Sequence, residues 1–218
     1  MYGFYHTNRK VQIIENNIVK EKIYIENLDN KLKVIILPKN TRKKYIVWST
    51  NFGSIDNKFY SSQNNELITV PDGSAHYLEH KLFEQENGKN SLDVLTSLGV
   101  DANAYTTNDH TAYLFECTEN FDEALDELMN YVQNPYFTEE NVEKERGIIE
   151  QEIVMYKDYP EWELYMNALK SMYKNNEINI DVAGSKETIA KITPETLYTI
   201  YNNFYTPENM VIVLARKF

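Results

Sequence analysis

The sequence predicts an α+β domain in which helices pack on a mainly antiparallel sheet. Strand-like segments come first, helices and a hairpin follow, and a last strand closes the chain, without strict alternation of strands and helices. Of the 218 residues, 42% are hydrophobic, and seven glycines and six prolines are too few for a disordered or fibrous chain. This length suits a sizeable core, so we predict that residues 1–218 form one domain.

The predicted strands lie mostly in the first half. Strands are expected at 21–26, 32–37 and 45–50, and a turn at 28–30 joins the first two. The polar segment 54–70 is expected to form a long loop that ends in a turn at 71–73. A hairpin is expected from strands at 102–107 and 111–117, and the last strand at 210–215.

Helical periodicity begins at Ser74, which is the expected N-cap of the first helix. Gly99 is expected to stop the next helix, and Pro135 and Pro160 separate the later ones. These further helices are expected at 92–98, 122–132, 139–156, 162–173, 186–192 and 194–204.

Charge and cysteine content exclude several classes of function. A net charge of -11 leaves no basic stripe for sequence-independent nucleic-acid binding. The single cysteine, Cys117, cannot form an internal disulfide, and its apolar neighbours indicate a buried strand thiol. Residues 1–10 lack an apolar secretion core, and no later stretch has the length of a transmembrane helix. We therefore expect a cytoplasmic protein with neither a nucleic-acid nor a membrane partner.

Residues 76–80 read His-Tyr-Leu-Glu-His, the H-x-x-E-H order of inverted zinc peptidase motifs. On a helix, residues four apart share a face, so His76 and His80 can point at one ion. Glu79 lies on that face and can take a proton from water beside the metal. The alternative is a solvated helix whose polar residues serve solubility alone. Two of the four histidines fall in this single turn, which favours the metal site.

A catalytic zinc site normally has three protein ligands, so a third is expected from elsewhere in the chain. Glutamates at 143, 145, 150 and 152 are the candidates, although most glutamates on a charged helix are only solvated. Glu145 and Glu152 are two helical turns apart and share nearly one face. One could ligate the metal while the other steadies a ligand histidine. Spacing alone does not choose among the four.

Several blocks together resemble the insulinase, pitrilysin and mitochondrial processing peptidase family of zinc peptidases. They span nearly the whole chain in the family's order, and H-K-L-F at 80–83 is similar to bacterial processing-protease-like members. The blocks are G-x-A-H-x-L-E-H at 73–80, N-A-Y-T at 103–106, R-G-I-I-E-Q-E-I at 146–153 with Tyr156, Asp158 and Pro160, and matches at 183–185, 192–193, 204–205 and 209–210.

The resemblance assigns roles to individual residues. It implies that His76, His80 and Glu152 bind Zn²⁺ and that Glu79 is the general base. It further implies that Glu145 hydrogen-bonds a ligand without itself binding the metal. It also implies that Asn103, Ala104 and Tyr105 belong to an edge strand that binds extended substrate. Such an edge offers unpaired backbone groups to which a peptide can add as another strand.

Members of this family usually contain paired domains with the active site between them, and the resemblance covers only the first. The expected activity is therefore that of a zinc-dependent endopeptidase domain acting on peptides or unfolded segments. A second family domain or subunit, in a homo- or hetero-oligomer, is expected to be needed for full activity. The alternative is a non-catalytic peptide-binding or scaffold subunit of the same family. Such subunits usually lose a ligand or the base, whereas this chain has the complete set.

Overall fold

A computed structural model describes residues 11–217, so the expectations for residues 1–10 lie outside the described part. A seven-stranded sheet has the order β1-β2-β3-β9-β4-β8-β7, and a two-stranded ribbon pairs β5 with β6. In the large sheet β3 and β9 run parallel, while the other neighbouring pairs are antiparallel. The strands are β1 (Gln12–Asn16), β2 (Glu21–Asn27), β3 (Lys33–Pro38), β4 (Lys44–Thr50), β5 (Lys58–Tyr60), β6 (Leu67–Thr69), β7 (Asp101–Thr106), β8 (Thr111–Cys117) and β9 (Met210–Arg216).

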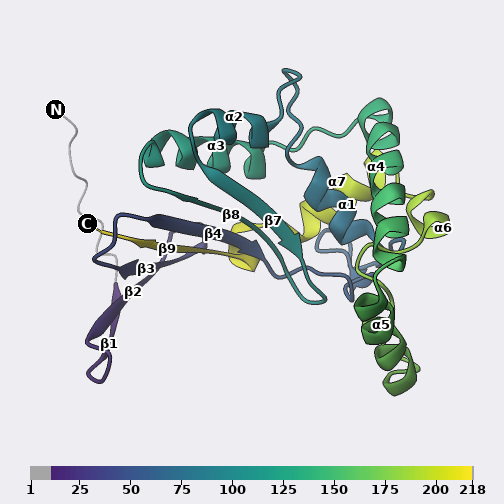
Figure 1. The fold of residues 1–218 in the computed structure, drawn as a ribbon, viewed down its shortest axis with the longest axis horizontal. Coiled ribbons are helices and arrows are strands. Elements are labelled where there is room, and N and C mark those ends of the chain that lie inside the picture. Colours follow the sequence, from purple (N-terminus) through teal and green to yellow (C-terminus); the bar gives the residue numbers. More distant parts are fainter. Residues whose placement is uncertain (1–10, 218) are drawn as a thin grey trace.

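The helices gather on one face and one end of the sheet (Figure 1). In this view α2 and α3 lie above the sheet, α4 to α6 stand together at the right, and the β1–β2 hairpin hangs at the left. The helices are α1 (Ser74–Lys81), α2 (Ser91–Ser97), α3 (Phe121–Gln133), α4 (Glu139–Lys157), α5 (Pro160–Met172), α6 (Lys186–Ile189) and α7 (Pro194–Phe204), with short 3₁₀ turns η1 (Glu177–Asn179) and η2 (Pro207–Asn209). The predicted α+β class is confirmed.

Strand alternation and burial place the core between the sheet and the helices. In β4, Ile46 and Trp48 are buried at alternate positions, as expected for a strand with one face covered. Tyr113 and Phe115 repeat this pattern in the neighbouring β8. Helix α1 is enclosed by α4, α7 and β7, and its Tyr77 is fully buried. The helix that carries the two histidines is therefore held on several sides.

Two glycines set where α1 begins. Gly73 is the N-cap and has a φ of 89°, a left-handed conformation that other residues adopt only with strain. A Cβ at Gly73 would lie 2.5 Å from the carbonyl oxygen of Ala183, and a Cβ at Gly184 would lie 2.5 Å from that of Asp72. The turn before α1 and the loop around Ala183 therefore pack backbone against backbone.

Most predicted elements are confirmed, three expectations are wrong, and one strand was not predicted. The expected loop at 54–70 contains the β5–β6 ribbon, and β1 was not predicted. Ser74 is the first helical residue rather than the N-cap, and its hydroxyl donates to the carbonyl of Pro71. Helix α6 ends at Ile189, because the backbone turns there before the Thr193 cap of α7. The buried position predicted for Cys117 is confirmed.

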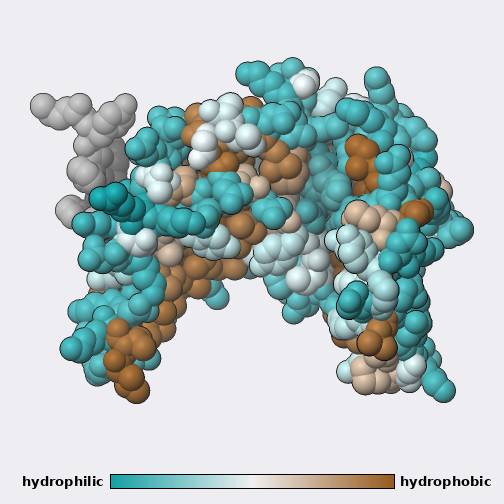
Figure 2. Space-filling view, viewed as in Figure 1, coloured by the Kyte–Doolittle hydropathy of each residue, from teal (hydrophilic) through white to brown (hydrophobic). Residues whose placement is uncertain are grey.

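Some apolar side chains remain on the surface of the described part. Figure 2 shows them at the free end of the β1–β2 hairpin and on α5. Ile18 and Leu164 are among the most exposed. Within residues 11–217, no helix combines the length and apolarity required to cross a bilayer.

Candidate metal centre

Helix α1 carries His76, Glu79 and His80 toward one side of the molecule. The two imidazole rings have centroids 4.5 Å apart, as their i, i+4 spacing predicts. The hydroxyl of Tyr77, the residue after His76 on α1, donates to the carbonyl of Val142 on α4. This bond links the two helices that contribute to the site.

Helix α4 brings Glu152 to the two histidines. Oε1 of Glu152 lies 3.7 Å from Nε2 of His76, and Oε2 lies 3.6 Å from Nε2 of His80. One ligand atom from each of the three residues lies within 4.8 Å of the other two. Zinc with ligands at 2.0–2.1 Å in a tetrahedron separates neighbouring ligand atoms by about 3.4 Å. The three side chains therefore fit a zinc ion.

The structure separates the other candidate glutamates from this group. Glu143 forms an ion pair with Arg146 on the exposed side of α4. Neither Glu143 nor Glu150 belongs to the cluster formed by the two histidines and Glu152. Glu145 lies behind His80, with its Oε1 2.9 Å from Nδ1 of that ring. If the ring donates Nδ1–H to this carboxylate, the lone pair at Nε2 is free to bind a metal.

The pKa values of the two histidines are shifted in opposite directions. Burial, with the nearby charge of His80, lowers the pKa of His76 to about 3, so His76 is neutral near pH 7. Burial also acts against protonation of His80. The hydrogen bond to Glu145 and the charges of Glu79, Glu145 and Glu152 outweigh it and raise the pKa of His80. The carboxylates therefore make a positive charge at the position of His80 more favourable.

Burial also shifts the pKa values of the three carboxylates. Burial raises the pKa of Glu79, against the lowering effect of its hydrogen bond to Thr106. Burial also raises the pKa of Glu152. For Glu145, burial acts to raise the pKa, but the hydrogen bond and charge of His80 outweigh it and lower the pKa. Glu145 thus has the environment of an ionised partner, while the raised pKa of Glu79 makes its ionised form a stronger proton acceptor than an ordinary glutamate.

A chain of hydroxyls holds Glu79. Thr106, at the end of β7, donates to Oε2 of Glu79 at 2.7 Å. Thr111 lies 3.4 Å from the Thr106 hydroxyl and donates to the carbonyl of Phe52 at 2.9 Å. When Glu79 is protonated, it can donate to Thr106, which can in turn donate to Thr111. The arrangement therefore offers Glu79 a partner in both protonation states.

A cavity of about 370 Å³ opens over these residues. One wall is the edge strand β7, which supplies the three predicted substrate residues Asn103, Ala104 and Tyr105. The backbone N–H of Ala104 donates to Oδ1 of Asn103 at 2.9 Å, which indicates that this amide faces the open edge. The other lining residues are His76, Glu79, His80, Thr106, Glu152, Tyr156, Trp162, Asp181, Val182 and Ala183.

Three site residues were missed from the sequence. Thr106 stands in the N-A-Y-T block, yet no role was predicted for it. Trp162 donates from its indole to Asp181 at 2.8 Å, and both residues line the cavity. The spacing of residues within one short motif cannot reveal these contacts, because each contact joins two separate segments of the chain.

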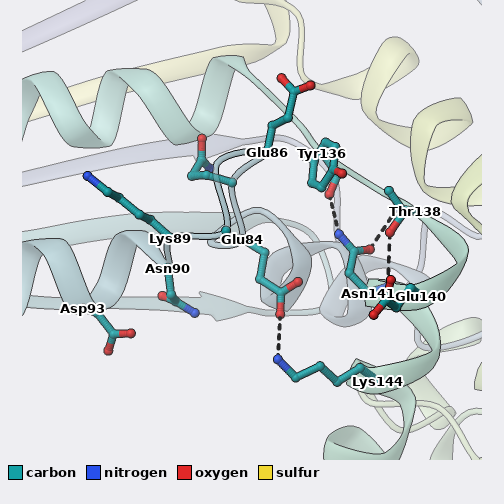
Figure 3. Close-up of a pocket in the computed structure, with 12 residues that line it drawn as sticks. Glu84, Glu86, Lys89, Asn90, Asp93, Tyr136, Thr138, Glu140, Asn141 and Lys144 are labelled. Atoms are coloured by element: carbon teal, nitrogen blue, oxygen red, sulfur yellow. Dashed lines mark hydrogen bonds and ion pairs between the residues drawn. The ribbon is translucent and has the colours of Figure 1, made fainter.

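A second cavity of about 520 Å³ lies between the segment after α1 and the start of α4 (Figure 3). Its lining is strongly polar and includes none of the predicted site residues. Lys144 and Glu84 face each other across it at 3.8 Å. The chemistry predicted from the sequence therefore concentrates in the smaller cavity.

Comparison with known proteins agrees with the fold and the motif order. Residues 69–186 match the profile of a family described as Insulinase (Peptidase family M16). The chain belongs to this family of peptidases.

Two relatives and one more distant structure illustrate the likeness. The chain is 46% identical to the uncharacterised zinc protease YmfH of Bacillus subtilis over 206 residues, which cover 94% of this chain and 48% of YmfH. An M16-like peptidase from Alicyclobacillus acidocaldarius superposes with a TM-score of 0.83 at 36% identity, over 98% of this chain and 47% of that one. A Helicobacter pylori protease shares the fold, with a TM-score of 0.76 at 20% identity over 96% and 47% of the two chains. The chain therefore spans about half the length of these proteins.

Proposed function

We propose that this chain is a zinc-dependent endopeptidase domain that hydrolyses peptides or unfolded polypeptide segments. One observation carries the proposal: ligand atoms of His76, His80 and Glu152 lie within 4.8 Å of one another. Glu79 lines the same cavity, as expected for a general base. The relatives carry the name zinc protease, which supports the choice of metal.

A zinc ion held by these three residues would act as a Lewis acid toward the substrate carbonyl and favour ionisation of water. Glu79 accepts a proton from the attacking water and passes it to the nitrogen of the leaving amine. Because Thr106 bonds Oε2 of Glu79, Oε1 is the oxygen that is free to take the proton. Glu145 keeps the His80 ring oriented through Nδ1.

The open edge of β7 is the proposed substrate-binding element. An extended peptide can pair with its outward backbone groups and run past Glu79. Binding of this kind replaces the bond between Ala104 N–H and Asn103 with a bond to the substrate backbone. Tyr105 is 42% exposed and offers an aromatic surface to a substrate side chain.

The proposal includes a second family domain or subunit, in a homo- or hetero-oligomer, for full activity. The relatives are about twice as long as this chain, which supports that part of the proposal. We also propose a cytoplasmic location, with which the single cysteine agrees.

Metal analysis of the purified chain tests the metal part of the proposal. We expect about one zinc per chain, and strong loss of zinc in His80→Ala. His110→Ala is the matched control, because His110 pairs with Asp109 outside the ligand cluster and should leave the zinc content unchanged. Equally low zinc in the unaltered chain and in His80→Ala would contradict the proposal.

Peptide cleavage in the presence of the proposed second family domain or subunit tests the catalytic part. Glu79→Gln keeps the shape of the side chain but cannot accept the proton. We expect this variant to retain zinc and lose cleavage. A scaffold subunit would instead show no change of function in Glu79→Gln, and that result would favour the non-catalytic alternative.

A further inference from the structure

Lys81 follows His80 directly and is the last residue of α1. Its side chain is 0% exposed, which is unusual for lysine because a buried cation needs compensating charges. Its Nζ lies 2.8 Å from Oε2 of Glu84 and 3.9 Å from Oε2 of Glu145. The proposed mechanism gives Lys81 no role.

The geometry of Glu145 connects Lys81 to the metal centre. The two oxygens of this carboxylate have different neighbours, since Oε1 contacts Nδ1 of His80 and Oε2 faces Lys81. Glu145 is itself mostly enclosed, so water competes little for either oxygen. A change at Lys81 would therefore alter the orientation of the carboxylate that holds His80.

We propose that Lys81 is a positioning residue for the metal centre, acting on His80 through Glu145. The proposal rests on the zinc site proposed above and adds a residue to its support. The Glu84 carboxylate lies 2.8 Å from the Lys81 amino group, and the attraction between Lys81 and Oε2 of Glu145 keeps Oε1 of Glu145 directed at the imidazole. The ring of His80 then presents Nε2 toward Glu152.

Lys144, a second lysine beside Glu84, provides a matched control. Glu84 also faces Lys144, and Figure 3 shows this pair at the edge of the larger cavity. Lys144 is 71% exposed, and an exposed pair at 3.8 Å contributes little. Replacing Lys144 removes a positive charge from the same partner, Glu84, while Lys144 acts on Glu145 only through its more exposed charge.

The test is the zinc dissociation constant of the full chain, measured by competition with a chromophoric chelator at fixed pH and ionic strength. We expect Lys81→Met to weaken zinc binding about tenfold, the lower end of the effect of partners that orient ligands. Lys144→Met should change the zinc dissociation constant by no more than about twofold. Thermal unfolding of the zinc-free variants checks that each is folded, and Lys81→Gln replaces Lys81→Met if the latter is not.

A second measurement separates positioning from general damage to the fold. Glu145→Gln should weaken zinc binding by itself, and adding Lys81→Met to it should cause no further loss, because the route through Glu145 is already broken. Unchanged affinity in the folded Lys81 variants would overturn the inference, and so would a full additional loss in the double variant. If the unaltered chain binds no zinc, the proposed function itself is contradicted.

Discussion

Replacing Thr106 by valine removes the hydroxyl that donates to the Glu79 carboxylate while keeping a β-branched side chain in strand β7. Glu79 is only 7% exposed, so water cannot easily replace the lost donor. We expect the metal-free chain to be less stable at neutral pH as a result. The size of the effect follows from the kind of bond that is lost.

A hydrogen bond to a charged group contributes about 1.5–3 kcal/mol to stability. We therefore expect Thr106→Val to lower the free energy of unfolding by about 2 kcal/mol at pH 8. For a chain of this size, 1 kcal/mol corresponds to about 2–4 °C, so the unfolding temperature should fall by about 4–8 °C. Thr106→Ser retains the hydroxyl and should recover most of the loss.

The effect should depend on pH, and its sign follows from the Glu79 pKa. Burial raises this pKa above its ordinary value of 4.5, despite the bond from Thr106. Because the folded pKa lies above the unfolded one, the contribution of this group to stability is complete below the unfolded pKa and is lost as pH rises through the folded pKa. Valine raises the folded pKa further, so Thr106→Val should lose more stability at pH 8 than at pH 5.

Thermal unfolding of the two variants in buffer with a chelator, at pH 5 and pH 8, measures both effects. A smaller difference should remain at pH 5, because a larger fraction of Glu79 is protonated there than at pH 8 and the protonated acid can donate to the Thr106 hydroxyl. If Thr106→Val and Thr106→Ser unfold at the same temperature at pH 8, the bond does not support Glu79. A difference that is the same at both pH values would show that the charge of Glu79 is not involved.

Three further predictions concern helix α1 and the metal. Gly73→Ala should lower the free energy of unfolding by at least about 2 kcal/mol in chemical denaturation, because a left-handed φ and the nearby Ala183 carbonyl both oppose a Cβ. Tyr77→Phe should lower it by about 1 kcal/mol in the same assay, since the carbonyl of Val142 loses one donor; no change would show that the link between α1 and α4 is not stabilising. Zinc at 100 times its dissociation constant should stabilise the chain by about 2.7 kcal/mol in thermal unfolding, and His80→Ala should abolish the shift.

The elements predicted correctly are those with a strong periodic pattern. Helix α7 was predicted with its observed ends, because Pro194 at the start is a strong local signal. Strand β1 was missed because every residue in it is exposed, and only pairing with β2 makes it a strand. The β5–β6 ribbon was missed because each strand has three residues, too few for a pattern.

For the site, local spacing predicts the histidines but not the third ligand. Val142, Ile149 and Ile153 form the buried stripe of α4. At 100° per residue, Glu145 and Glu152 lie on one flank of this stripe, and glutamates 143 and 150 lie on the other. Which flank meets α1 depends on how the two helices are rotated when they pack. That choice is a tertiary property, and the family resemblance supplied it where the spacing could not.

The charges around the histidines explain why a divalent cation suits this position. Glu79, Glu145 and Glu152 carry three negative charges when ionised, and the nearby cation Lys81 is shared between Glu145 and Glu84. With neutral histidines the cluster therefore retains a net negative charge, which an enclosed site tolerates poorly. The raised pKa values of Glu79 and Glu152 reflect that cost, and Zn²⁺ would balance the remaining charge. The same carboxylates that bind or orient ligands therefore also favour an ion of charge +2 over a monovalent one.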